Sequence, residues 1–236
     1  MPFDEPPYRQ PTEGDTRMPL ISLVRHGQAS FGAQDYDVLS DLGREQAEAV
    51  GHELARRGLR DPHLVTGTLN RQRDTARLLA EAAGFKDPLR EDPRWNEYDH
   101  VALLSRYTGP EPEGQADSRA VQGLLDRALE AWIQDAEETG PAGWTAFENG
   151  TTAALTELSA TLGKGRDAVV VTSGGVLAAL CGALLSLPAA GVVALNRVTV
   201  NAAVTTLVVG GSGTSLLTFN DHAHFITDRR ALLTYR

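Results

Sequence analysis

Short apolar runs alternate along the chain with longer stretches in which apolar residues recur at helical spacing. Three of the runs have the length and the flanking turn residues of buried strands: residues 20–24, 63–66 and 168–172. A stretch with helical spacing follows each run, over residues 41–57, 69–83 and 176–187. Strands that alternate with helices in this way predict a mostly parallel sheet with helices on both faces.

The boundaries and the remaining segments extend this pattern. Ser40 and Asp41 have the chemistry of a helix N-cap and first turn, and Gly58, Gly84 and Pro188 are suitable helix stops. Further helices are predicted at 121–137 and 147–162, and further strands at 88–92, 198–209 and 215–219. A glycine-rich turn between the last two strands predicts a hairpin. The expected fold class is therefore an α/β three-layer α/β/α sandwich, with a mostly parallel sheet and an antiparallel edge.

Length and local composition indicate how the chain is organised. A chain of 236 residues is long enough for one large α/β domain or two small ones. Residues 1–18 are rich in proline and charge, which predicts a flexible tail ahead of a catalytic domain spanning 19–236. Residues 98–147 make the longest excursion from the predicted sheet, with a loop at 105–120, so we expect them to form a lid over the site.

Charge and composition limit the classes of partner and the compartment. The chain carries 31 acidic and 22 basic residues, a net charge of −9, and contains no Lys/Arg-rich block. It is therefore a poor candidate for binding nucleic acid or an anionic membrane. The lack of a long apolar stretch and of a secretory signal favours the cytoplasm, and the single Cys181 in an apolar run favours a buried thiol. The late apolar hairpin is compatible with a homodimer, and the sequence leaves the oligomeric state open.

Candidate chemistry begins at the end of the first predicted strand. Arg25, His26 and Gly27 directly follow this strand, and the active sites of open α/β sheets form at such strand ends. The turn presents a guanidinium group and an imidazole side by side. This pairing suits an anionic group that is held and a nucleophile that attacks it, although a lone Arg–His pair is more often packed or solvated.

Later segments carry candidate partners for this pair. Arg71 falls in the first turn of the second helix, where an arginine can hold phosphate oxygens beside backbone N–H groups. Glu97 lies in an irregular stretch and is a candidate general acid. Ser173, Gly174 and Gly175 form a strand-to-helix turn whose N–H groups suit an oxyanion. Taken singly, each also fits a role without catalysis: Arg71 as a solvated arginine, Glu97 as an exposed carboxylate, and residues 173–175 as a tight turn.

Four motifs occur in a characteristic order. They are Leu-Val-Arg-His-Gly at 23–27, Leu-x-Arg-x-x-x-Thr-Ala at 69–76, Asn-Glu at 96–97 and Val-Thr-Ser-Gly-Gly at 171–175. Together they resemble the histidine phosphatase superfamily, the phosphoglycerate mutase-like proteins, over roughly residues 20 to 225. The resemblance implies hydrolysis of small phosphomonoesters through a phosphohistidine, without a metal or a cofactor.

The resemblance also implies a role for each matching residue. His26 is the expected nucleophile, and Glu97 is the expected proton donor to the leaving alkoxide. The expected phosphate-binding residues are Arg25, Arg71, Ser173 and Gly174. Gln28 and Tyr98 are expected at the substrate. His222 and His224 are a candidate metal pair without supporting ligand spacing, so no metal site is predicted there.

The chain departs from the family pattern in three places. Ser173 stands where the family has a second histidine, and a neutral hydroxyl in place of a charged donor costs about 1–2 kcal/mol. That loss is about ten- to thirtyfold in rate, which weakens catalysis without abolishing it. Phe-Gly at 31–32 replaces the Trp-Asn of many mutases, and Tyr-Asp-His at 98–100 replaces Arg-His-Tyr-Gly. We expect His222 and His224 to serve packing or substrate contact and not to replace the missing imidazole.

Three alternatives to phosphatase activity remain. Phosphoglycerate mutase-type phosphoryl transfer is disfavoured by the departures after residues 27 and 97. A weakly active or non-catalytic binder of phosphorylated ligands would account for Ser173. A serine hydrolase is the most remote reading, because Val171 stands where the nucleophile elbow needs glycine.

Overall fold

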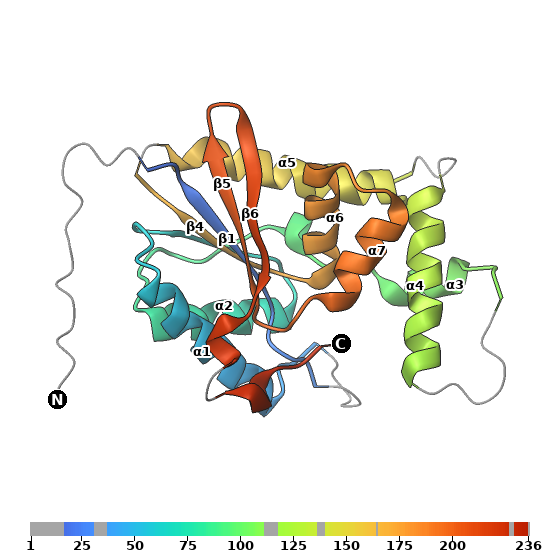
Figure 1. Cartoon of the computed structure of the whole chain (residues 1–236), viewed down its shortest axis with the longest axis horizontal. Coiled ribbons are helices and arrows are strands. Elements are labelled where there is room, and N and C mark those ends of the chain that lie inside the picture. The colour runs from blue at the N-terminus through green and yellow to red at the C-terminus, as the bar shows by residue number, and fades with distance from the viewer. Residues whose placement is uncertain are drawn as a thin grey trace.

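The computed structural model describes residues 17–30, 37–110, 118–135, 140–163, 165–226 and 229–235. Within these ranges a six-stranded mixed sheet forms the centre of the molecule, in the order β3-β2-β4-β1-β5-β6 (Figure 1). The strands are β1 (Leu20–Arg25), β2 (His63–Thr66), β3 (Arg90–Glu91), β4 (Ala168–Thr172), β5 (Val204–Gly210) and β6 (Gly213–Asp221). Strands β3, β2, β4 and β1 are parallel, and β5 and β6 add an antiparallel edge. The predicted fold class is confirmed.

Two pairs of helices cover the two faces of the sheet (Figure 1). Helices α1 (Asp41–Arg56) and α2 (Asn70–Ala83) cover one face, and α5 (Trp144–Leu162) and α6 (Gly174–Leu185) cover the other. Side chains alternate between the faces along each strand. Val24 and its register partner Val171 belong to the α1–α2 core, whereas Leu23 and its partner Val170 belong to the α5–α6 core.

A third group of helices lies at one end of the sheet (Figure 1). It comprises α3 (His100–Arg106), α4 (Ser118–Gln134) and α7 (Ala189–Val198). A separate apolar cluster joins these helices to the start of α5 and includes Tyr98, Leu129 and Val192. The predicted lid segment at 98–147 thus contains α3, α4 and the first turn of α5. Three short 3-10 turns complete the described elements: Pro93–Trp95, Ala223–Phe225 and Arg230–Leu232.

Two predicted boundaries were wrong, and both have a local cause. The helix predicted to run to residue 187 and stop at Pro188 ends at Leu185, with Ser186 as its left-handed C-cap, and Pro188 is the N-cap of α7, which the sequence reading missed. The strand predicted from residue 198 starts at Val204, because Val198 is still the last residue of α7 and residues 201–202 form a turn. There Ala202 adopts a left-handed conformation with φ 54°, and its N–H donates to the Arg25 carbonyl at 3.0 Å.

Three further expectations can be compared only in part with the structure. Helix α3 begins at His100, ahead of the predicted loop at 105–120, because Asp99 caps it by accepting from two backbone N–H groups. Most of the predicted tail, and residues 31–32, lie outside the described residues.

None of the helices in the described ranges is both long enough and apolar enough to span a membrane.

Candidate active site

The candidate nucleophile lies where β1 and β4 end side by side. Arg25 pairs with Thr172 in the parallel register, and the His26 N–H donates to the Thr172 carbonyl at 2.9 Å. Both side chains are buried, with Arg25 5% and His26 6% exposed. The carboxyl ends of neighbouring parallel strands meet at one edge of a sheet, so the first and fourth motifs come together here as the sequence predicted.

Hydrogen bonds to the two ring nitrogens of His26 fix its tautomer. Nδ1 lies 2.7 Å from the Gly27 carbonyl oxygen, which only accepts, so Nδ1 carries the proton of the neutral ring. Nε2 therefore holds the lone pair, and it accepts from Nε of Arg71 at 3.2 Å. The imidazole presents its nucleophilic nitrogen to a guanidinium group that can bind an anion.

The backbone around His26 is held in a narrow space. The Gly27 N–H donates to Oγ1 of Thr75 at 3.0 Å, and the His26 carbonyl accepts from Nδ2 of Asn201 at 3.1 Å. A Cβ atom on residue 27 would lie 2.3 Å from the carbonyl oxygen of Gly43. The turn after β1 therefore requires glycine for close approach to α1, and contacts from three distant segments fix the position of the imidazole.

Arg71 reaches this imidazole from the first turn of α2. Its Nη1 donates to Oδ1 of Asp37 at 2.7 Å, and its Nε faces His26. The other carboxylate oxygen of Asp37 accepts from the Asn70 N–H at 2.7 Å. The arginine is therefore held between a carboxylate and the candidate nucleophile at a helix N-terminus, where anions bind favourably.

Arg25 and Glu97 both lie at the N-terminus of α6. A Cβ atom on Gly174 would be 3.7 Å from Nε of Arg25, and the Arg25 Nη1 donates to the Thr199 carbonyl. The Glu97 carboxylate accepts from the Gly175 N–H at 3.2 Å and from the Tyr98 N–H at 3.2 Å. The contacts connect the second, third and fourth motifs to the first at one edge of the sheet. The site therefore brings together the His26 imidazole, two guanidinium groups and the Glu97 carboxylate.

Ser173 and Gln28 are engaged with neighbouring protein groups. Ser173 is fully buried, and its hydroxyl accepts from Nε2 of Gln72 at 2.9 Å. The same Nε2 also donates to the Trp95 carbonyl at 2.9 Å. Oε1 of Gln28 accepts from the Ser40 hydroxyl at 3.1 Å, at the start of α1. The roles of Ser173 and Gly174 at the phosphate and of Gln28 and Tyr98 at the substrate stay predictions.

His222 and His224 form their hydrogen bonds away from the candidate nucleophile. Nδ1 of His222 lies 2.6 Å from the Asn220 carbonyl, and Nε2 of His224 lies 3.2 Å from the Ala202 carbonyl. The His224 ring packs on Phe225 with a centroid separation of 4.1 Å. These contacts agree with the expected packing role. Among the described residues, no group of three or more His, Cys, Asp or Glu side chains is arranged to hold a metal ion.

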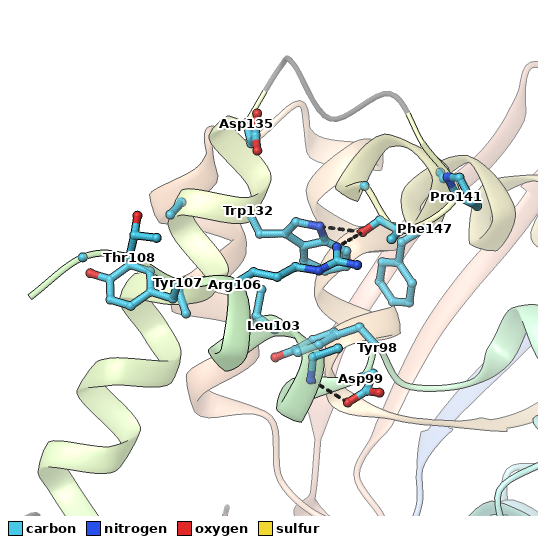
Figure 2. A pocket seen from close by; sticks show the side chains of 17 residues that line it. Tyr98, Asp99, Leu103, Arg106, Tyr107, Thr108, Trp132, Asp135, Pro141 and Phe147 are labelled. Carbon is cyan, nitrogen blue, oxygen red and sulfur yellow. Dashed lines mark hydrogen bonds between the residues drawn. The ribbon is translucent and has the colours of Figure 1, made fainter. Parts of the chain in front are cut away.

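A cavity of about 620 Å³ opens between α3, α4 and the start of α5 (Figure 2). Tyr98, Leu103, Trp132 and Phe147 line it, with Arg106 beside Trp132. The Tyr98 ring lies 5.5 Å from that of Trp132 and 5.9 Å from that of Phe147, centroid to centroid. Tyr98 directly follows Glu97, and a Cβ atom on Gly175 would lie 2.1 Å from Oε1 of Glu97 and 2.4 Å from the Tyr98 ring, so both side chains lie at the N-terminus of α6.

The sequence reading missed the residues that hold the motifs in place. Asp37 and Asn201 lie outside the four motifs, and Gln72 is one of the unspecified positions of the second motif. The available signal for Asp37 was weak: an acidic residue in a polar loop ahead of a helix.

Comparisons with known proteins agree with this arrangement. Residues 21–222 match the family model of the histidine phosphatase superfamily (branch 1). The glucosyl-3-phosphoglycerate phosphatase of Mycolicibacterium vanbaalenii is 31% identical over 188 residues, which are 73% of this chain and 76% of that protein. The 2,3-bisphosphoglycerate-dependent phosphoglycerate mutase of Rhizobium johnstonii is 29% identical over 190 residues, 76% of this chain and 85% of the relative.

Two further comparisons bear on coverage and fold. The probable phosphoglycerate mutase GpmB of Serratia proteamaculans is 32% identical over 133 residues, which span 47% of this chain and only 60% of that relative. The solved structure of a mycobacterial glucosyl-3-phosphoglycerate phosphatase in complex with VO3 aligns with a TM-score of 0.63 and 27% identity. That alignment covers 86% of this chain and 99% of the solved chain.

Proposed function

Because the chain belongs to the histidine phosphatase superfamily, we propose that it hydrolyses small phosphomonoesters through a phosphohistidine on His26. The observation that carries the proposal is the state of the His26 ring. Its Nδ1 proton is held by the Gly27 carbonyl, so Nε2 carries the lone pair and can attack phosphorus without first losing a proton. Arg71 lies at hydrogen-bond distance from that nitrogen, where a phosphoryl group would be bound.

In the first half of the reaction, Nε2 of His26 forms a bond to phosphorus while the bond to the ester oxygen breaks. Arg25 and Arg71 offset the charge on the transferring phosphoryl oxygens. Glu97 gives its proton to the leaving alkoxide, and general acid help of this kind is worth about 10²–10⁴-fold. The N–H groups that bind Glu97 fix the direction from which the proton comes.

In the second half, the Glu97 carboxylate takes a proton from water, and the resulting hydroxide attacks phosphorus. The bond between phosphorus and Nε2 breaks, the imidazole regains its lone pair, and inorganic phosphate is released. The residues named supply both half-reactions, so the proposed cycle needs neither a metal nor a cofactor.

Phosphoglycerate mutase activity is the alternative, since relatives of similar identity carry that name. The local charge favours the phosphatase. Where mutases have Arg-His-Tyr-Gly after the catalytic glutamate, this chain has Tyr98 facing an aromatic cavity and Asp99 capping α3. We expect a carboxylate at that position to favour the carboxylate of a phosphoglycerate less than the arginine of the mutases does.

The test is a panel of phosphate monoesters, assayed for phosphate release in the presence of a chelator. We expect turnover by the parent protein, loss of at least about 10³-fold in His26→Asn, and no change in His52→Asn, whose side chain is exposed on α1. Interconversion of 2- and 3-phosphoglycerate, measured in parallel, separates a mutase from a phosphatase. Phosphate binding without turnover of any ester would support the non-catalytic alternative.

A further inference from the structure

A single carboxylate organises the N-terminus of α2 and its arginine. Oδ2 of Asp37 accepts from the Asn70 N–H at 2.7 Å, and Oδ1 accepts from the Arg71 N–H at 3.5 Å and from Arg71 Nη1 at 2.7 Å. Asp37 lies 33 residues before Asn70 in the sequence, so these bonds are tertiary contacts. The same side chain therefore binds the backbone of the helix and the guanidinium group of its first turn.

The helix cannot supply this carboxylate from its own N-cap. The N-cap residue of α2 is Leu69, which has no side-chain oxygen to accept from the first N–H groups. Asp37 takes over that function from outside the helix. A carboxylate is also the favoured group at a helix N-terminus, because it offsets the positive end of the helix dipole.

The same bonds decide where the guanidinium group points. Arginine is long and flexible, and its orientation toward a ligand is lost unless another group holds it. With Nη1 bound to Asp37, Nε of Arg71 faces Nε2 of His26 at 3.2 Å, and the arginine side chain is only 11% exposed. The phosphate-binding edge of Arg71 is therefore directed at the nucleophile before any substrate arrives.

The carboxylate also changes the charge that a phosphate group meets. The Asp37–Arg71 pair is close to neutral, so part of the attraction of Arg71 for a phosphate dianion is offset. The product of the proposed reaction is inorganic phosphate, which a site with two unopposed arginines would retain. A carboxylate bound to the far edge of one arginine weakens product binding and leaves the orientation intact.

We propose that Asp37 is a positioning residue that aims Arg71 at His26 and whose negative charge limits the retention of phosphate. The proposal rests on the proposed function for its catalytic part. It makes separate predictions for the acceptor oxygens of Asp37 and for its charge. Asparagine keeps an acceptor oxygen without the charge, and alanine keeps neither the oxygen nor the charge.

Four variants separate these effects. Asp37→Ala removes both acceptor oxygens and the charge, whereas Asp37→Asn removes the charge and one acceptor oxygen and keeps the other oxygen for Arg71. Leu69→Ser in the Asp37→Ala background restores an N-cap oxygen to α2 without restoring the tether on Arg71. Asp74→Asn is the matched control, because Asp74 lies on the same helix and pairs with Arg77 at 3.3 Å, not with Arg71.

The measurements are kcat and KM on one phosphomonoester, the Kd of inorganic phosphate by calorimetry, and the melting temperature. We expect kcat to fall on the order of tenfold in Asp37→Ala and to stay low when Leu69→Ser raises the melting temperature again. In Asp37→Asn we expect kcat within about threefold of the parent value and phosphate bound about fivefold more tightly. Asp74→Asn should match the parent protein in all three measurements.

Several results overturn the inference alone. They are a parent-like kcat in Asp37→Ala, full recovery of kcat by the Leu69 substitution, and an unchanged phosphate Kd in Asp37→Asn. If the parent protein binds phosphate but hydrolyses no ester, the proposed function fails. The phosphate Kd of the parent and of Asp37→Asn, measured by calorimetry, still tests the effect of the Asp37 charge. If the parent protein neither binds phosphate nor hydrolyses esters, the proposed function and the inference fail together.

Discussion

We expect acid to destabilise this protein in part through one half-buried imidazole, that of His224. Its Nε2 lies 3.2 Å from the Ala202 carbonyl, which only accepts, so Nε2 carries the proton of the neutral ring. Nδ1 is buried and has no hydrogen-bond partner among the described residues. Burial lowers the pKa of His224 from 6.5 to about 4, and the nearby carboxylates of Glu53 and Asp221 only partly offset this effect.

The sign of the pH dependence follows from this lowered pKa. Between pH 6.5 and 4 the unfolded chain binds a proton at His224 that the folded protein does not bind. The free energy of unfolding therefore falls as the pH drops below about 6.5, and the loss from this residue levels off near pH 4. Linkage gives about 2 kcal/mol of destabilisation between pH 7 and pH 5, an upper value because the ring is partly exposed.

The assay compares urea unfolding of the parent protein and His224→Gln at several pH values across this interval. Glutamine keeps an N–H donor for the Ala202 carbonyl but does not titrate, so the contributions of all other groups cancel in the difference. The parent protein should lose about 2 kcal/mol more than the variant. His52→Gln, an exposed histidine on α1, should retain the parent's pH dependence. Equal pH dependence in the parent and His224→Gln would refute the reasoning.

Three further predictions follow from contacts near the site and in the core. Gly27→Ala forces the new Cβ against the Gly43 carbonyl and should lower kcat/KM on the order of 100-fold, whereas Gly150→Ala, which meets no atom within 4 Å, should match the parent enzyme. Burial raises the pKa of the Cys181 thiol to about 12, so thiol reagents at pH 8 should label the protein only after unfolding; labelling of the folded protein would contradict this. Asn201→Ala removes the donor to the His26 carbonyl and should cost about 1–3 kcal/mol in urea unfolding, a prediction that an unchanged midpoint would contradict.

The sheet and its covering helices were predictable because their signals are local. The runs that became β1, β2 and β4 are apolar and end in turn residues, and Ser40 caps α1 with a hydroxyl that accepts from the Gly43 N–H at 3.1 Å. Helix α7 was not predictable in the same way, because Pro188, which follows α6 closely and reads as a helix stop, is the N-cap of the next helix. The start of β5 at Val204 depends on contacts with β1 that the sequence pattern does not record.

The same distinction applies to the candidate site. His26, Arg71 and Glu97 were identifiable because each belongs to a motif at the end of a strand or the start of a helix. The groups that orient them are single polar residues distant in the chain, such as Asp37 and Asn201, which bond to Arg71 and His26. Polar residues of this kind are common in loops, so their type and spacing do not reveal which partner they bind.

A covalent phosphohistidine is the central claim, and a burst experiment on Glu97→Gln tests it most directly. A nitrophenyl phosphate has a leaving group that needs no proton, so His26 can still be phosphorylated, whereas water attack is slowed without the carboxylate. The account predicts a burst of about one equivalent of nitrophenolate per enzyme, with an acid-labile phosphate on His26 found by mass spectrometry. Steady turnover with no labelled protein, or a phosphate carried by another residue, would contradict it.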